Sequence, residues 1–201
     1  MSDTLRPGGL ALTKRMLELI TPTYGSRILD VGCGGGATVS LLRERGFVAF
    51  GVDIELPADA LPELLCADAT SLPFPDGDMD AVLFECSLSK IETPEVALCE
   101  ARRVLKSGGK LMVSDLFTLY KSQNFSGLLG RLEPWHNIMR RTEAQGFALC
   151  NFEEHGDALS QFWGQLVFDH GLRAARELMC GCADELKSPD NSYFLAIFTA
   201  V

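Results

Sequence analysis

The 201-residue chain is poor in basic residues, in histidine and in long apolar segments. Lys and Arg number 18 against 27 Asp and Glu, which gives a net charge of -9 and a pI near 4.8. Nucleic-acid binding relies on clustered Lys and Arg, so we expect no nucleic-acid partner. No apolar run approaches the roughly 20 residues of a membrane helix, so we expect no membrane partner. The segment MSDTLRPGG has no basic region followed by an apolar core, and we expect a cytoplasmic protein.

The seven cysteines have neither the even number nor the spacing of a disulfide framework, and we expect reduced thiols. Cys180 and Cys182 form the one close pair, and the three histidines are too dispersed to complete a zinc motif. We therefore expect no metal site.

Short apolar runs alternate with helical patterns, which is typical of a parallel sheet covered on both faces by helices. The length and the 47% hydrophobic composition suit one core, so we expect one domain over 1–201, with 1–24 as an N-terminal helix or lid. Strands are predicted at 27–31, 48–53, 64–66, 81–85, 110–115, 147–152 and 193–200. Helices are predicted at 10–20, 37–45, 94–105, 134–145 and 157–179.

Residues 116–134 form the longest stretch without a clear pattern. A loop of this length is either functional or an ordinary surface connection. The sequence leaves both interpretations open: a lid over a site, or a connection without a function.

The segment ILDVGCGGGATV, residues 28–39, joins the first predicted strand to the following helix. Glycines let a ligand approach the main chain closely, and free amides at a helix start bind polar or anionic atoms. The spacing of Gly32, Gly34 and Ala37 also fits a dinucleotide fingerprint. The glycines alone therefore do not distinguish a nicotinamide dinucleotide from another nucleoside.

Acidic residues stand at or just after the ends of three successive predicted strands. Asp30 suits a cationic amino group and disfavours a pyrophosphate, Asp53 suits two ribose hydroxyls, and Asp68 suits the exocyclic amine of adenine. S-adenosylmethionine carries a positive charge, an amine and a diol. The alternative for each carboxylate is structural: Asp30 capping the turn, and Asp53 or Asp68 as a solvated loop acid.

Four segments together resemble the class I S-adenosylmethionine-dependent methyltransferases, in particular the small type-11 domains: DVGCGGGATV, GVDI, CADATSLPFPDGDMDAVLFECSLS and EARRVLKSGGKLMVSDL. The resemblance covers about residues 9–200 and implies an α/β, Rossmann-like, doubly wound fold. Its seven-stranded sheet would be mostly parallel with an antiparallel last strand and helices on both faces. The resemblance implies S-adenosylmethionine as cofactor, S-adenosylhomocysteine as product, and cofactor contacts at Asp30, Gly32, Cys33, Gly34, Gly36, Asp53, Ile54, Asp68, Ala69 and Glu85.

Methyl transfer from a sulfonium has an activated leaving group, so alignment of the nucleophile carries much of the catalysis. We expect direct displacement onto a small molecule, in a crevice at the carboxyl ends of the strands, by a monomer or homodimer. Glu85 and Asp115, expected to face this crevice, are candidates to orient or deprotonate the acceptor, with structural hydrogen bonding as the alternative. Where quinone-type relatives often have histidine, this chain has Ser89 or Lys90.

Several alternatives stay open. In the first, the chain is a subunit that binds the cofactor but is not catalytic, or is active only with a partner. In the second, it is a methyltransferase for a thiophilic acceptor held by Cys33, Cys66 and Cys86. In the third, it is an NAD-dependent oxidoreductase. Arg6 either folds over the site toward a carboxylate of the ligand or belongs to an ordered tail. The aromatic residues Trp135, Phe162 and Trp163 line an acceptor pocket or belong to the core.

Overall fold

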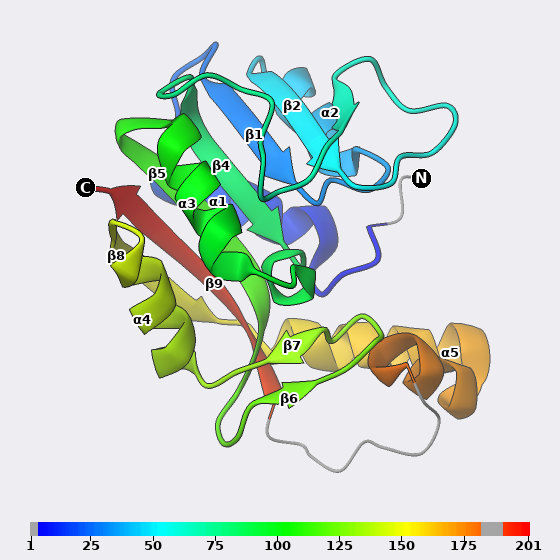
Figure 1. The fold of residues 1–201 in the computed structure, drawn as a ribbon. Coiled ribbons are helices and arrows are strands. Elements are labelled where there is room, and N and C mark those ends of the chain that lie inside the picture. Colours follow the sequence, from blue (N-terminus) through cyan, green and yellow to red (C-terminus); the bar gives the residue numbers. More distant parts are fainter. Residues whose placement is uncertain (1–3, 182–190) are drawn as a thin grey trace.

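The computed structural model describes residues 4–181 and 191–201, and its centre is a seven-stranded sheet in the order β3-β2-β1-β4-β5-β9-β8 (Figure 1). The strands from β1 to β5 are parallel, and β9 is antiparallel to both of its neighbours. The predicted fold class is therefore confirmed. The strands are β1 (Arg27–Val31), β2 (Val48–Asp53), β3 (Leu64–Cys66), β4 (Met79–Glu85), β5 (Leu105–Thr118), β8 (Phe147–Glu154) and β9 (Asn191–Ala200).

Helices cover both faces of the sheet, with α3 in front of it and α1 behind it in Figure 1. The helices are α1 (Gly9–Ile20), α2 (Ala37–Glu44), the 3₁₀ turn η1 (Leu88–Lys90), α3 (Pro94–Val104), α4 (Trp135–Ala144) and α5 (Gly156–Cys180). Strand β4 shows why both faces need cover, because Leu83 packs in the core cluster under α1 and α2 while Phe84 packs under α3. Successive side chains of a strand point to opposite faces.

A third apolar cluster packs helix α5 and part of the segment 116–132 against the sheet. It joins Leu12 of α1, Leu116 of β5, Leu166 of α5 and Tyr193 of β9. The same cluster includes Leu132 in the two-stranded hairpin of β6 (Gln123–Asn124) and β7 (Arg131–Leu132). The stretch 116–134 is therefore partly ordered as a hairpin, and its role as a lid stays a prediction.

Two of the predicted elements differ from the sequence expectation in length or regularity. Strand β5 extends from Leu105 to Thr118, well beyond the expected 110–115, because Leu105 pairs with Met79 of β4 and the pairing with β9 continues to Thr118 opposite Asn191. Helix α5 spans Gly156–Cys180 but is broken at Gly171, whose φ of 79° and ψ of 159° are not helical. Glycine adopts a positive φ without the steric penalty of a Cβ, which explains where this helix kinks.

Two glycines of α5 make a matched test of this kink. A Cβ would meet nothing within 4 Å at Gly164 or at Gly171, and only Gly171 has a positive φ. Gly164→Ala should raise the free energy of unfolding by about 0.5–1 kcal/mol. Gly171→Ala should lower it by roughly 1–2 kcal/mol, because alanine is strained there. Urea denaturation measures both changes, and equal effects would contradict a local kink at Gly171.

Candidate active site

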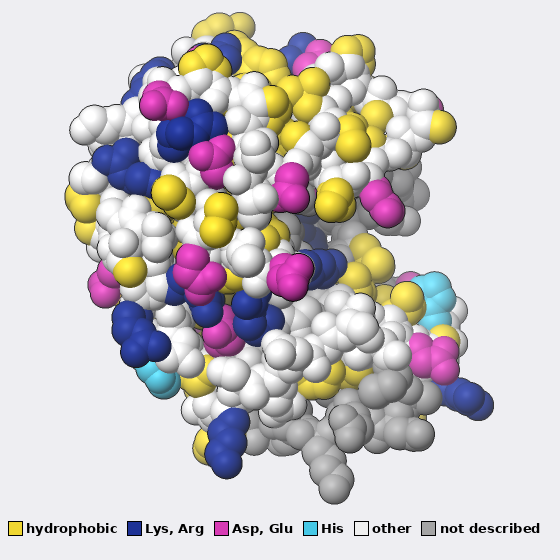
Figure 2. All heavy atoms as spheres, in the orientation of Figure 1, with side chains coloured by type: hydrophobic (Ala, Val, Ile, Leu, Met, Phe, Trp, Pro, Cys, Tyr) yellow, Lys and Arg dark blue, Asp and Glu magenta, His cyan; other side chains and the backbone are white. Residues whose placement is uncertain are grey.

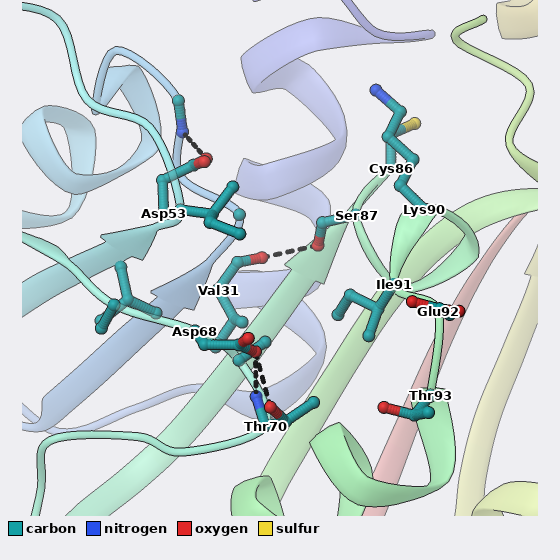
Figure 3. Close-up of a pocket in the computed structure, with 16 residues that line it drawn as sticks. Val31, Asp53, Asp68, Thr70, Cys86, Ser87, Lys90, Ile91, Glu92 and Thr93 are labelled. Carbon is teal, nitrogen blue, oxygen red and sulfur yellow. Dashed lines mark hydrogen bonds between the residues drawn. The ribbon is translucent and has the colours of Figure 1, made fainter. Parts of the chain in front are cut away.

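A cavity of about 620 Å³ opens at the carboxyl ends of the parallel strands (Figure 3). Strand β1 has β2 on one side and β4 on the other, so the chain connections leave it in opposite directions. Doubly wound sheets bind ligands at such a reversal of strand order. We call this hollow the switch-point cavity. Among the residues predicted for the cofactor, those that line it are Gly32, Gly34, Asp53, Ile54, Asp68 and Ala69.

The glycine-rich loop brings bare main chain to the cavity. Gly32 has a φ of 81°, and a Cβ there would lie 2.3 Å from the Cβ of Ser87. Gly34 has a φ of 50°, and a Cβ there would meet nothing within 4 Å. Gly32 is therefore required for the packing of the loop against the segment after β4, whereas the space beside Gly34 is open to a ligand.

Asp53 and Asp68 lie on the walls of the cavity in Figure 3. Asp53 Oδ2 accepts a hydrogen bond from the Gly34 amide at 2.8 Å, so the end of β2 also fixes the glycine loop. Asp68 Oδ1 accepts from the amide and the hydroxyl of Thr70, at 2.8 and 2.7 Å, and these bonds lower the pKa of Asp68. The carboxylates of half-buried Asp53 and exposed Asp68 thus lie at neighbouring strand ends and can accept hydrogen bonds from a ligand.

Other residues of the lining were not among the predicted contacts. They come from the segment that follows β4 and from the end of the CADAT segment. The feature of the sequence that they share, and that could have identified them, is a position shortly after the end of a strand. They are Thr70, Cys86, Ser87, Lys90, Ile91, Glu92 and Thr93. The remaining lining is apolar: Val31, Val52 and Ala67.

The expectation that Glu85 faces the crevice is wrong in this structure. Its side chain points to the face under α1 and α2, where Oε1 accepts from Thr13 Oγ1 at 2.8 Å. Oε2 accepts from Thr38 Oγ1 and from Arg6 Nη2, each at 2.8 Å. The Glu85 side chain is only 2% exposed, since the hydroxyls and the guanidinium replace water. Arg6 thus reaches a carboxylate, but one that belongs to the chain itself.

Asp30 is buried on the same face of the sheet, one strand away from Glu85. In the described part of the chain no hydrogen bond or ion pair reaches its carboxylate. Burial, then the nearby charges of Glu85 and Asp53, raise the pKa of Asp30 to about 8, against the opposing effect of Arg6. Burial also raises the pKa of Glu85, opposed chiefly by Arg6. Arg6 is therefore bonded to Glu85 and affects the buried carboxyl group of Asp30 only through its charge.

Asp115, the second catalytic candidate, is likewise turned away from the switch-point cavity. Its oxygens accept hydrogen bonds from the amide and hydroxyl of Ser89, both at 2.9 Å, and from the Leu116 amide at 2.8 Å. Burial raises its pKa, and these bonds oppose the rise. Asp115 therefore anchors η1 to the end of β5. Neither Gly36 nor Cys33 lines the cavity, although both lie in the loop beside it.

The three thiols considered for a thiophilic acceptor lie in separate environments. Cys86, with a φ of 54°, is within 3.2 Å of the Tyr193 hydroxyl, and burial raises its pKa. Burial together with Asp30 and Asp53 raises the pKa of Cys33 to about 12. Thiolates, not thiols, ligate soft ions, so these environments oppose that role. Cys182, of the pair with Cys180, lies outside the described residues.

The aromatic candidates for an acceptor pocket are partly buried and pack against the core clusters. Trp135 lies 4.4 Å from the ring centroid of Phe152 and 5.0 Å from that of Phe194. Phe162 and Trp163 pack against the third apolar cluster. Across residues 4–181 and 191–201, no helix has the length and apolar character to cross a membrane.

Comparison with known proteins agrees with this geometry. Residues 29–113 match the family model described as a methyltransferase domain. A demethylmenaquinone methyltransferase of Renibacterium salmoninarum is 31% identical over 122 residues, which cover 57% of this chain and 52% of that protein. The O-methyltransferase rstn1 of Aspergillus nomiae is 32% identical over 129 residues, 57% of each chain. The chain thus spans about half the length of the curated relatives it matches.

Solved structures extend the likeness of fold to nearly the whole chain. Geranyl diphosphate C-methyltransferase of Streptomyces coelicolor, solved with Mg2+, geranyl diphosphate and S-adenosyl-L-homocysteine, has a TM-score of 0.77. It is 13% identical, and the match covers 95% of this chain and 79% of that one. The fold and the cavity define a doubly wound α/β protein with a hollow at the reversal of strand order. Residues 29–113 are thus similar to a methyltransferase domain, and the solved neighbour shares the fold of nearly the whole chain.

The buried pair of Arg6 and Glu85 can be tested against a surface pair of the same type. Arg6→Met should lower the free energy of unfolding by about 3–5 kcal/mol, because it leaves a buried carboxylate without its cation. Arg15 pairs with Glu153 at 2.6 Å on the surface, with 43% of the arginine side chain exposed. Arg15→Met should therefore change stability little. Denaturant unfolding compares the two variants, and losses of equal size would contradict a special role for the buried pair.

Proposed function

We propose that the chain transfers a methyl group from S-adenosylmethionine to a small-molecule acceptor. The observation that carries this proposal is the meeting of Asp53, Asp68 and the open main chain at Gly34 around one cavity at the strand-order reversal. Asp53 offers acceptors for the ribose hydroxyls and Asp68 for the adenine amine. Ile54 and Ala69, which line the same cavity, offer apolar contact to the adenine ring.

Asp30 suits the cationic end of this ligand, although it acts from beneath the loop and not from the cavity wall. Its carboxyl group is short of positive charge, because the single guanidinium of Arg6 is hydrogen-bonded to Glu85. A ligand ammonium near the loop supplies the missing charge and favours the ionised carboxylate. The ligands of structural neighbours support this proposal, since several solved neighbours contain S-adenosylmethionine or S-adenosylhomocysteine.

Catalysis in this proposal rests on alignment. When bound, S-adenosylmethionine supplies a methyl group on an activated sulfonium. The new bond from the acceptor atom to the methyl carbon forms as the carbon–sulfur bond breaks with its electrons on sulfur. The acceptor's proton, where it has one, leaves to solvent. We assign no general base to Glu85 or Asp115, since both carboxylates are occupied by hydrogen bonds within the fold.

The cofactor proposal is tested by calorimetric titration of the reduced protein with S-adenosylmethionine and S-adenosylhomocysteine, beside NAD. Both adenosyl compounds should bind and NAD should not. Asp53→Ala should weaken binding by about 10- to 100-fold, because it removes charge-assisted hydrogen bonds to the ribose. Asp59→Ala is the matched control, since Asp59 is exposed and does not line the cavity. Tight binding of NAD alone would favour the oxidoreductase instead.

The raised pKa of Asp30 predicts a pH-dependent affinity. A carboxyl with a pKa of about 8 is mostly protonated near neutrality, and a cationic ligand binds its ionised form better. The affinity for S-adenosylmethionine should therefore increase between about pH 6 and about pH 7.5, by up to about tenfold per unit. Asp30→Asn should bind more weakly at the upper end of this range and lose the slope, whereas Asp59→Asn should keep it. An unchanged slope in Asp30→Asn would remove Asp30 from the site.

A further inference from the structure

A second cavity, of about 670 Å³, adjoins the switch-point cavity. The two hollows share Lys90, Ile91 and Glu92. The far wall of the second one is formed by residues 124–131, around the β6–β7 hairpin, so we call it the hairpin cavity. In Figure 2 the molecule is hollowed between the sheet and the lower part that contains the hairpin and α5, and Lys or Arg side chains stand at this hollow.

The lining of the hairpin cavity combines apolar surface with positive charge. Phe125 and Leu128 present apolar side chains. The lining contains two cations, Lys90 and Arg131, and one carboxylate, that of Glu92. The chain as a whole carries -9, so a lining with more cations than anions runs against the general balance. Local positive charge attracts an anionic ligand that the rest of the surface repels.

The two cations differ in what they already contact. Arg131 Nη2 donates to the Ile91 carbonyl, and its Nε lies 3.6 Å from a Glu133 oxygen, so this guanidinium is held and compensated. Lys90 is exposed, and among residues 4–181 and 191–201 its ammonium makes no hydrogen bond or ion pair. Figure 3 shows its side chain extending from η1 beside Cys86. Lys90 is thus the cation that remains available where the cavities meet.

We infer that the hairpin cavity binds the methyl acceptor, and that this acceptor carries a carboxylate or phosphate group which pairs with Lys90 beside an apolar portion on Phe125 and Leu128. The inference rests on the proposed function, because an acceptor must lie beside the cavity that holds the methyl donor. An ammonium pairs with either anion as a point charge.

The first experiment measures binding of small probes to the protein saturated with S-adenosylhomocysteine. Benzoate and phenyl phosphate represent the two anionic groups, and benzyl alcohol is the neutral analogue. At least one anion should bind at least about tenfold more tightly than benzyl alcohol, and this advantage should diminish with added salt. The stronger of the two anions identifies which group the site prefers. Equal binding of all three probes, or binding of none, would overturn the inference.

Variants identify the side chain responsible. Lys90→Met should remove the preference for the anion, while Lys90→Arg should keep it. Lys121→Met is the matched control, since Lys121 is exposed and lies outside both cavities. Glu92→Gln should preserve or strengthen anion binding. Equal effects of Lys90→Met and Lys121→Met would count against Lys90.

The same titrations separate the two proposals. Failure of S-adenosylhomocysteine to bind the wild-type protein would overturn the proposed function. Normal binding of S-adenosylhomocysteine together with no anion preference would overturn only the acceptor inference.

Discussion

The burial of the Glu85 carboxylate is the constraint on which the arrangement of the N-terminal segment, α1 and the start of α2 depends. Burying an unpaired charge costs several kcal/mol, so the fold must bring polar partners to it. Arg6 comes from the N-terminal segment, Thr13 from α1 and Thr38 from α2, and all three hydrogen-bond to the carboxylate or to one another. The start of α2 immediately follows the glycine loop. The ion pair therefore ties the N-terminal segment to the element that positions this loop.

The reversal of strand order supplies the cavity itself, and the third apolar cluster supplies its neighbour. Strands β1 and β2 end beside each other, so the glycine loop and Asp53 are brought within hydrogen-bond distance across 19 residues of sequence. Leu129 and Leu132 pack with Tyr193 and Met179, which holds the hairpin against the sheet and α5. The hairpin then faces the segment after β4. In our proposals, the site of the methyl donor thus depends on the order of the strands, whereas the site of the methyl acceptor depends on the third apolar cluster.

Much of the fold was predictable because its signals are local. Apolar runs and helical periodicity identified every strand of the large sheet to within a few residues, apart from the long extension of β5. The extension at its carboxyl end depends on pairing with β9, whose partner positions lie about 80 residues away. The hairpin at 123–132 escaped prediction for a similar reason, since each of its strands has two residues and carries no periodic pattern.

The sequence by itself determined the fold class, the loop with its glycines, and the presence of acidic groups at strand ends, because these follow from local residue type and spacing. Only the tertiary structure decided which acids meet the cavity. Strand alternation directs Glu85 toward α1 and α2, and Asp115 is occupied by Ser89 and Leu116. The strand pattern indicates which side chains share a face. The partners that occupy a carboxylate come from distant segments, and their arrival depends on packing that no local pattern encodes.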